Sequence, residues 1–140
     1  MLTEKDYCDY DTCVALKELG FSEPTLAYYH GFWPSKPLLY LVIDEDCMPE
    51  DGVNVFNLLS NSNKYKDSKN IDAPTLWEAQ KWLREERHLH IEVRWYSNLW
   101  YEYEVKEAEG KILAEGSAFK TYEEAQSTAI YMAIEHLKEK

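Results

Sequence analysis

The stretch that decides the fold is residues 75–95, "TLWEAQKWLREERHLHIEVRW". It opens like a helix, because Thr75 can accept a hydrogen bond from the backbone of Glu78 while the glutamate reaches back to the threonine. The apolar residues that follow share one helical stripe: Leu76, Ala79 and Leu83. From His88 onward the apolar residues alternate with polar ones, which is typical of a half-buried strand. The stretch therefore predicts a helix that leads directly into a strand.

The first phrase of this stretch returns 46 residues later, since "TLWEAQ" at 75–80 is followed by "TYEEAQ" at 121–126. Thr121 and Glu124 have the same spacing as the first pair, so the second phrase also begins a helix. That helix places its small and apolar residues on one side: Ala125, Ala129, Ile130, Ala133 and Leu137. The repeated residues supply helix capping and contain no catalytic group set. We interpret the repeat as one structural task performed twice.

Two strands with alternating polarity lie between these helices, over residues 88–96 and 100–106. The apolar set of the first contains Leu89, Ile91, Val93 and Trp95, and that of the second contains Tyr101, Tyr103 and Val105. The segment "KILAEGSAF" predicts a third strand, which leads to the second helix after a turn at Glu109 and Gly110.

The register of the first two strands is limited by the rule that apolar side chains lie beside apolar ones. A two-residue turn breaks this rule, so we expect a loop of three or five residues. One permitted register pairs Arg94 with Glu104 and Glu92 with Lys106, and its neighbour pairs Glu92 with Glu104. Opposite charges favour the first, with a loop at Asn98 to Trp100.

The chain before residue 75 predicts a first helix that begins at Asp9 or Asp11 and ends near Leu19, with Gly20 as its C-terminal cap. Further elements are a strand at 25–30, a turn at 31–37 and a buried strand at 38–43. Residues 44–72 have the composition of a long irregular loop.

The resulting order is α-β-β-loop-α-β-β-β-α. Consecutive strands on short turns predict an α+β fold, in which helices pack on a small antiparallel sheet of about four to five strands. At 140 residues the chain fits a single domain over residues 1–140.

Charge and composition exclude several classes of function. The 26 acidic and 15 basic side chains give a net charge of −11, which disfavours binding to nucleic acid. The longest apolar run, Pro37 to Ile43, is too short to span a membrane. The N-terminal residues lack a signal-peptide pattern, and the three cysteines, Cys8, Cys13 and Cys47, contain no C-x-x-C spacing. We expect a cytoplasmic protein.

Three segments carry a resemblance to a known family: "LKELGFSEPTLAYY", "APTLWEAQKWLREERHLHIEVRW" and "TYEEAQSTAIYMAIEHL". Together they resemble a family of small uncharacterised proteins carried by gut bacteria, their prophages and mobile elements. The resemblance departs mainly between Asp44 and Lys69. It implies a cytoplasmic accessory protein of a mobile element, and it brings no activity, ligand or catalytic residue with it.

A metal site has one candidate set, His88, His90 and Glu92, which fall on the same side of one strand, with Glu102 or Glu104 as a further ligand. The alternative is that His88 interacts with a helix C-terminus and His90 lies on an ordinary polar face. We favour this alternative and expect no metal or other cofactor.

Other residue patterns give no support for a site. The acidic residues between Asp44 and Asp51 lack the ligand spacing of a calcium loop. Cys8 and Cys13 have no identifiable histidine partner, so the sequence assigns no catalytic residue.

One feature points to a binding surface. Tyr96 and Trp100 fall on the polar side of their strands, near the hairpin turn and beside Arg94 and Glu102. Exposed aromatic residues next to arginine are typical of protein interfaces. The alternative is that another element covers this side and makes the two aromatic residues part of the core.

These observations favour a non-enzymatic binding or regulatory protein of a phage or mobile element, which acts on a protein partner. The second hypothesis is an acidic inhibitor that mimics nucleic acid, and the third is a metal-dependent or hydrolytic enzyme. The sequence leaves the oligomeric state open.

Overall fold

The structure is a computed structural model that describes residues 4–30, 38–41 and 71–139. The chain divides into two compact units, an N-terminal unit of Tyr7–Pro74 and a C-terminal unit of Met1–Asp6 with Thr75–Lys140. The chain would be a single domain if both units folded and unfolded in one cooperative transition. The expectation of one domain over 1–140 therefore stays a prediction.

The N-terminal unit begins with helix α1 (Tyr10–Glu18). Asp9 is its N-cap, and the Asp9 carboxylate accepts a hydrogen bond of 2.8 Å from the backbone N–H of Thr12. The helix ends at Leu19, and Gly20 has a φ of 101°, a left-handed conformation that favours glycine. The predicted start and end of this helix are confirmed.

Three short strands follow in the N-terminal unit: β1 (Ala27–His30), β2 (Leu38–Leu41) and β3 (Ile71–Asp72). They form an antiparallel sheet in the order β2-β1-β3. The predicted loop over 44–72 is therefore wrong at its end, because Ile71 and Asp72 pair with β1. The rest of that loop and the predicted turn at 31–37 lie outside the described residues.

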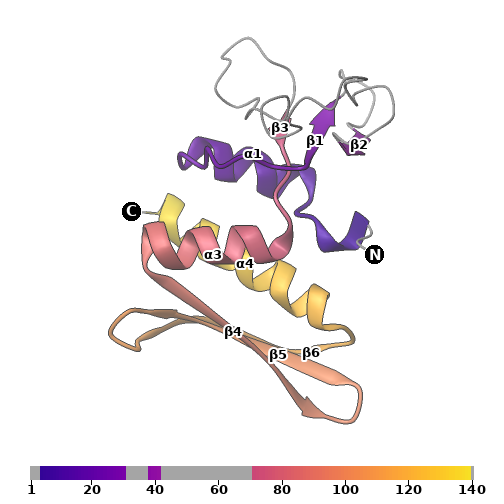
Figure 1. The fold of residues 1–140 in the computed structure, drawn as a ribbon. Coiled ribbons are helices and arrows are strands. Elements are labelled where there is room, and N and C mark those ends of the chain that lie inside the picture. Colours follow the sequence, from indigo (N-terminus) through magenta and orange to yellow (C-terminus); the bar gives the residue numbers. More distant parts are fainter. Residues whose placement is uncertain (1–3, 31–37, 42–70, 140) are drawn as a thin grey trace. The chain divides into compact units, whose positions relative to one another are not determined.

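The C-terminal unit contains a short 3-10 helix (Glu4–Asp6) and five longer elements. These are α3 (Leu76–Arg87), β4 (Leu89–Ser97), β5 (Trp100–Glu107), β6 (Ile112–Phe119) and α4 (Tyr122–Lys138). The strands form an antiparallel sheet in the order β4-β5-β6. Both helices lie over the same face of this sheet, and no other described element of this unit covers the opposite face, which we call the open face (Figure 1).

This arrangement confirms the α+β fold, and the order of elements matches the prediction apart from the additional strand β3. The distribution of strands differs from the prediction of one sheet of about four to five strands, because the described strands form two sheets of three. The sequence pattern identifies a strand and its apolar face, whereas membership of a sheet depends on contacts between distant segments.

The repeated phrase caps both helices of the C-terminal unit. Thr75 accepts from the backbone N–H of Glu78 at 3.1 Å, and the Glu78 carboxylate accepts from the backbone N–H of Thr75 at 2.9 Å. Thr121 accepts from the backbone N–H of Glu124 at 3.1 Å, and the return bond of a capping box is not formed there. The capping function is thus confirmed at both phrases, and the complete box at the first.

The last residue of each phrase makes a contact that the sequence analysis missed. The Nε2 group of Gln126 donates to Oε1 of Gln80 at 2.7 Å, and Nε2 of Gln80 donates to the backbone oxygen of Ile91 at 3.1 Å. Both glutamines are buried, and beside them Ala79 and Ala125 are fully buried. This bridge joins α3, α4 and strand β4 inside the core.

The register of the β4–β5 hairpin corrects the prediction. Arg94 pairs with Glu102 and Glu92 pairs with Glu104, which is the neighbouring register that the charges disfavoured. The turn has two residues, Asn98 and Leu99, and a bulge between Trp95 and Ser97 restores the apolar pairing that a two-residue turn breaks.

The glutamine bridge predicts an asymmetric response to two matched substitutions. Gln80→Met leaves the Ile91 oxygen and the Gln126 amide N–H without partners, so we expect it to cost about 3 kcal/mol of unfolding free energy. Gln126→Met leaves Oε1 of Gln80 without its donor but also removes Oε1 of Gln126, which is buried and lacks a partner among the described residues, so we expect it to cost about 1 kcal/mol. Urea unfolding of both variants measures the difference. Equal costs, or a larger cost at Gln126, would contradict the bridge.

Candidate functional site

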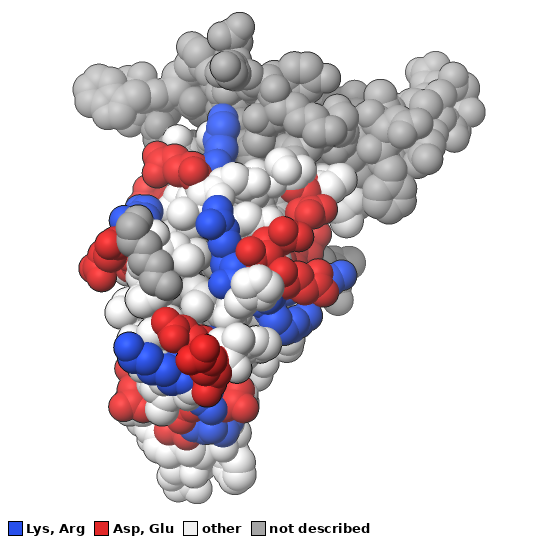
Figure 2. Space-filling model, turned by 90° about the vertical axis from the view of Figure 1, so that its left-hand side faces the viewer, with Lys and Arg blue, Asp and Glu red and all other residues white. Residues whose placement is uncertain are grey.

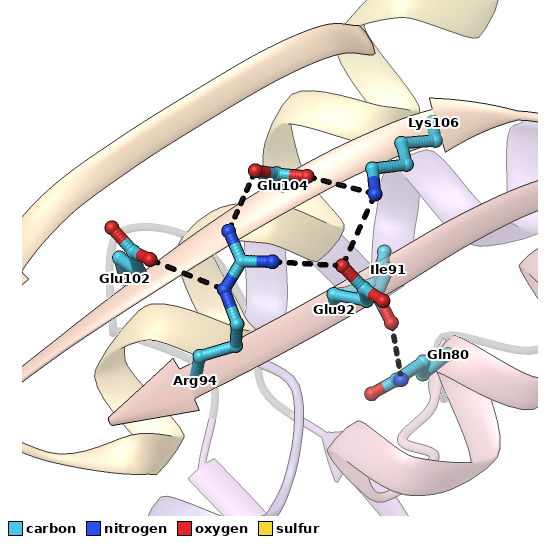
Figure 3. A network of polar contacts seen from close by, with 7 residues as sticks. All are labelled: Gln80, Ile91, Glu92, Arg94, Glu102, Glu104 and Lys106. Carbon is cyan, nitrogen blue, oxygen red and sulfur yellow. Dashed lines mark hydrogen bonds and ion pairs between the residues drawn. The ribbon is translucent and has the colours of Figure 1, made fainter. Parts of the chain in front are cut away.

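The open face of the C-terminal sheet carries a network of five charged side chains. The guanidinium of Arg94 contacts three carboxylates, those of Glu92 at 3.2 Å, Glu102 at 3.1 Å and Glu104 at 2.6 Å. The Nζ atom of Lys106 lies 3.2 Å from Glu92 and 2.9 Å from Glu104 (Figure 3). The two pairs of opposite charge that the sequence favoured, Arg94 with Glu104 and Glu92 with Lys106, therefore form diagonally across the strands.

The network stabilises the charged form of three of its members. The hydrogen bonds of Glu104 to Lys106 and Arg94 lower the pKa of its carboxyl group. Glu104 in turn raises the pKa of Arg94 and of Lys106. All three groups are therefore charged at neutral pH, and none has a pKa shifted toward the range needed for acid–base catalysis.

Four large apolar side chains are exposed at the end of the β4–β5 hairpin, and we call them the hairpin tip: Trp95, Tyr96, Leu99 and Trp100. Their exposed fractions are 62% for Trp95, 43% for Tyr96, 76% for Leu99 and 37% for Trp100. The tip projects away from both helices in Figure 1, and the lowest part of the molecule in Figure 2 is free of charged side chains. Exposed apolar side chains gathered at one end of a hairpin make that end a candidate interaction site.

Two aromatic rings of the tip are held in place by hydrogen bonds. The indole Nε1 of Trp95 donates to the backbone oxygen of Asn98 at 2.7 Å. The hydroxyl of Tyr96 accepts from the backbone N–H of Ala118 at 3.2 Å, which ties the tip to strand β6. Because these bonds use the polar atoms of both rings, the tip presents mainly apolar surface in a fixed geometry.

The backbone at these two anchor points is unusual. Asn98 has a φ of 35° and Ala118 a φ of 69°, both in the left-handed region. Asparagine tolerates this conformation in turns, whereas an alanine there is strained by roughly 1 kcal/mol. Strained backbone that anchors exposed side chains is characteristic of functional surfaces.

Further aromatic rings continue from the tip toward the helices. Tyr101 lies opposite Trp95 in the hairpin, and its ring meets Tyr122 edge-on at 6.0 Å. Tyr122 stacks on the exposed Trp77 at 5.6 Å. The start of α3 and the start of α4 thus support the base of the hairpin.

The structure places the four predicted binding residues at neighbouring positions. Tyr96 and Trp100 are exposed in the tip, so the alternative that another element buries them in the core is not what the structure shows. Arg94 and Glu102 adjoin the tip as an ion pair. Sequence reasoning missed Trp95 and Leu99, because alternation assigned Trp95 to the apolar side and gave no information about where the helices end.

The candidate metal ligands are not brought together. His88 is the C-terminal cap of α3 with a left-handed φ of 58°, so it is not a strand residue that shares a face with His90. Glu92 belongs to the ion-pair network. Within residues 4–30, 38–41 and 71–139, no three His, Cys, Asp or Glu side chains are grouped to hold a metal ion. The acidic residues 44–51 lie outside the described residues.

Cys8 and Cys13 of the N-terminal unit are buried. The Sγ atom of Cys13 lies 3.6 Å from the backbone oxygen of Cys8. A hydrogen bond to Cys8 and burial both raise the pKa of the Cys13 thiol, so it stays protonated and is a poor nucleophile. Cys47 lies outside the described residues.

Comparisons of the chain with protein-family models, with curated proteins and with solved structures gave no match. None of the helices in the described parts of the chain is long and apolar enough to cross a lipid bilayer. The assignment of function therefore depends on the surface itself.

The ion-pair network predicts an altered pH dependence in the variant Arg94→Met. The lowered pKa of Glu104 stabilises the folded wild type above the unfolded pKa of about 4.3, and this stabilisation is lost as pH falls through the folded pKa. In the variant, Glu104 loses its hydrogen bond from Arg94 and keeps the one from Lys106. The pKa of Glu104 in the folded variant is then lowered less than in the wild type, so less stabilisation depends on its ionisation.

We expect the difference in melting temperature between Arg94→Met and wild type to be constant above about pH 4.3 and to shrink as pH is lowered below it, where the wild type loses the stabilisation from Glu104. Arg84→Met is the control, because Arg84 is exposed on α3 and forms no ion pair with the described residues. A difference from wild type that stays constant with pH would show that the network does not stabilise the sheet.

Proposed function

We propose that this protein is a non-enzymatic binding protein and that the hairpin tip is its contact surface for a protein partner. The observation that carries the proposal is the exposure of Trp95 and Leu99, of which Trp95 is also fixed by a hydrogen bond to the turn. Burial of two such side chains releases about 2–3 kcal/mol each relative to solvent exposure. Fixed rings lose little conformational freedom on binding, which favours a stable complex.

The tip also has the composition that protein interfaces favour. Tryptophan, tyrosine and arginine are the residues most enriched among those that dominate binding energy, and Trp95, Tyr96 and Arg94 lie side by side in sequence. The resemblance to small proteins of prophages and mobile elements suggests an accessory or regulatory role in the bacterial cytoplasm.

Mimicry of nucleic acid is the second candidate function. It is favoured by the carboxylates of the open face, where Glu92 and Glu104 lie directly opposite each other. Mimicry of nucleic acid ranks second because Arg94 and Lys106 form ion pairs with these carboxylates and neutralise part of their charge. An enzymatic function has no such support, since the pKa shifts of Arg94, Glu104 and Lys106 all favour the charged forms and none approaches the range needed for acid–base catalysis.

The binding function predicts a site-specific crosslink. Benzoylphenylalanine at Leu99 should capture a partner protein from lysate of the native host, whereas the same group at Ile112 should not. Ile112 is a matched control, because it is exposed to 48% at the other end of the sheet. The captured protein is then purified, and its affinity for the unlabelled wild type is measured by titration calorimetry.

In that titration, Trp95→Ser should weaken binding by about 2 kcal/mol or more, as is usual for a central aromatic residue. Its melting temperature should change little, because Trp95 is exposed. Ile112→Ser should leave the affinity unchanged. Equal capture from both positions, or full affinity in Trp95→Ser, would exclude the tip as the binding surface.

A further inference from the structure

A row of three glutamates crosses the open face of the C-terminal sheet. Glu92 lies opposite Glu104, and Glu104 lies opposite Glu115, so the row covers all three strands. Like charges directly opposite each other destabilise a sheet. If stability alone had shaped this surface, residues of opposite charge would face each other at these positions. The directly opposed glutamates are therefore better explained by a role in binding.

The basic residues of the face compensate this row only in part. The open face carries four carboxylates, those of Glu92, Glu102, Glu104 and Glu115, and two cations, Arg94 and Lys106. These six side chains have a formal charge of 2 − 4 = −2. Glu115 is exposed and forms no ion pair with any described residue. The face therefore has unused capacity to accept hydrogen bonds from a cationic group.

The row is continuous with the hairpin tip. Trp100, Glu102 and Glu104 occupy every second position of β5 and so lie on the same face of the sheet. Side chains two positions apart on a strand are separated by about 7 Å. A partner that covers Trp100 consequently extends over Glu102 and approaches the row. The tip provides apolar contact, and the row provides negative charge next to it.

We infer that the partner of the tip is a protein surface with an apolar pocket bordered by arginine or lysine side chains, which pair with the carboxylates of the open face. This inference rests on the proposed function and adds the chemistry of the partner. Arginine fits best, because its planar guanidinium forms paired hydrogen bonds with a carboxylate. Glu115 is the carboxylate that the arginine contacts first, because Glu115 has no ion pair within the described residues that would have to be broken.

Two other occupants fit the same observations less well. A bacterial membrane surface is anionic and repels both the open face and a chain with a net charge of −11. A second copy of the chain would place the same carboxylates against one another in a symmetric contact. The edge of β4 is also partly blocked against strand pairing, because Gln80 occupies the Ile91 oxygen and a bulge follows Trp95.

The test uses two peptides that differ only in charge. One is acetyl-Arg-Leu-Arg-Trp-Arg-amide, and the other has citrulline, the neutral isostere, in place of each arginine. Each is titrated into the full ¹⁵N-labelled chain, and binding is followed by amide and indole NMR shifts. Wild type, Glu115→Gln and the control Glu86→Gln are compared, because Glu86 is exposed on α3, which covers the opposite face.

We expect both peptides to shift the indole signals of Trp95 and Trp100, and only the arginine peptide to shift the amides of Glu104 and Glu115. The arginine peptide should bind at least about fivefold more tightly, as several exposed charge pairs would give. This ratio should fall at least about twofold in Glu115→Gln and stay unchanged in Glu86→Gln. It should nearly vanish in about 0.5 M salt, where the screening length is only about 4 Å.

Each contrary result has a distinct meaning. Equal binding of both peptides at the tip would overturn the basic partner and leave the proposed function standing. Arginine-dependent shifts away from the open face, or no shift with either peptide, would also overturn the inference, and the crosslinking experiment then decides the proposed function separately. Quenching of the tip indoles by phosphatidylcholine vesicles would assign the tip to lipid. Dimerisation in sedimentation runs, lost in Trp95→Ser, would assign it to a second copy.

Discussion

The buried contact between Gln80 and Gln126 is the interaction on which the C-terminal unit depends. One amide hydrogen bond of 2.7 Å joins the two helices, and a second, of 3.1 Å, joins Gln80 to the backbone of β4. Such a bond is costly to leave unmade inside a core, so it fixes how the helices lie on the sheet. The small side chains of Ala79 and Ala125, both fully buried, leave room for this approach.

The position of the helices then determines which part of the sheet stays uncovered. The helices cover one face of the sheet, and the β4–β5 turn projects away from both of them (Figure 1). Trp95 is for this reason exposed, although it continues the alternation of the buried Leu89 and Ile91. The same hairpin register that forms the tip also places Glu92 opposite Glu104, so the apolar end and the acidic face arise together. An interface that combines both features selects its partner by shape and by charge.

The local elements could be predicted from the sequence because their causes are local. The caps Asp9, Thr75 and Thr121 act on backbone groups within a few residues, and the helices begin where these residues predict. Alternation identified β4 and β5 because the side chains of a strand point to opposite faces in turn. The charge pairs of Arg94 with Glu104 and of Lys106 with Glu92 were predicted as directly opposite neighbours. That register was wrong, but the pairs form diagonally because long side chains reach diagonal neighbours as well.

The remaining features depend on contacts between distant segments, which spacing along the chain does not specify. The bulge after Trp95 changed the register, because one extra residue shifts the pairing and no local signal marks it. The hydrogen bond from the backbone N–H of Ala118 to the Tyr96 hydroxyl joins residues on different strands. It fixes the position of the Tyr96 ring, whereas alternation predicted only which face of the sheet the ring is on. The sequence by itself therefore determined the helices, the strands and their polarity. The tertiary structure decided the register, the exposure of the tip and the meeting of the two glutamines, because each of these is set by packing between elements.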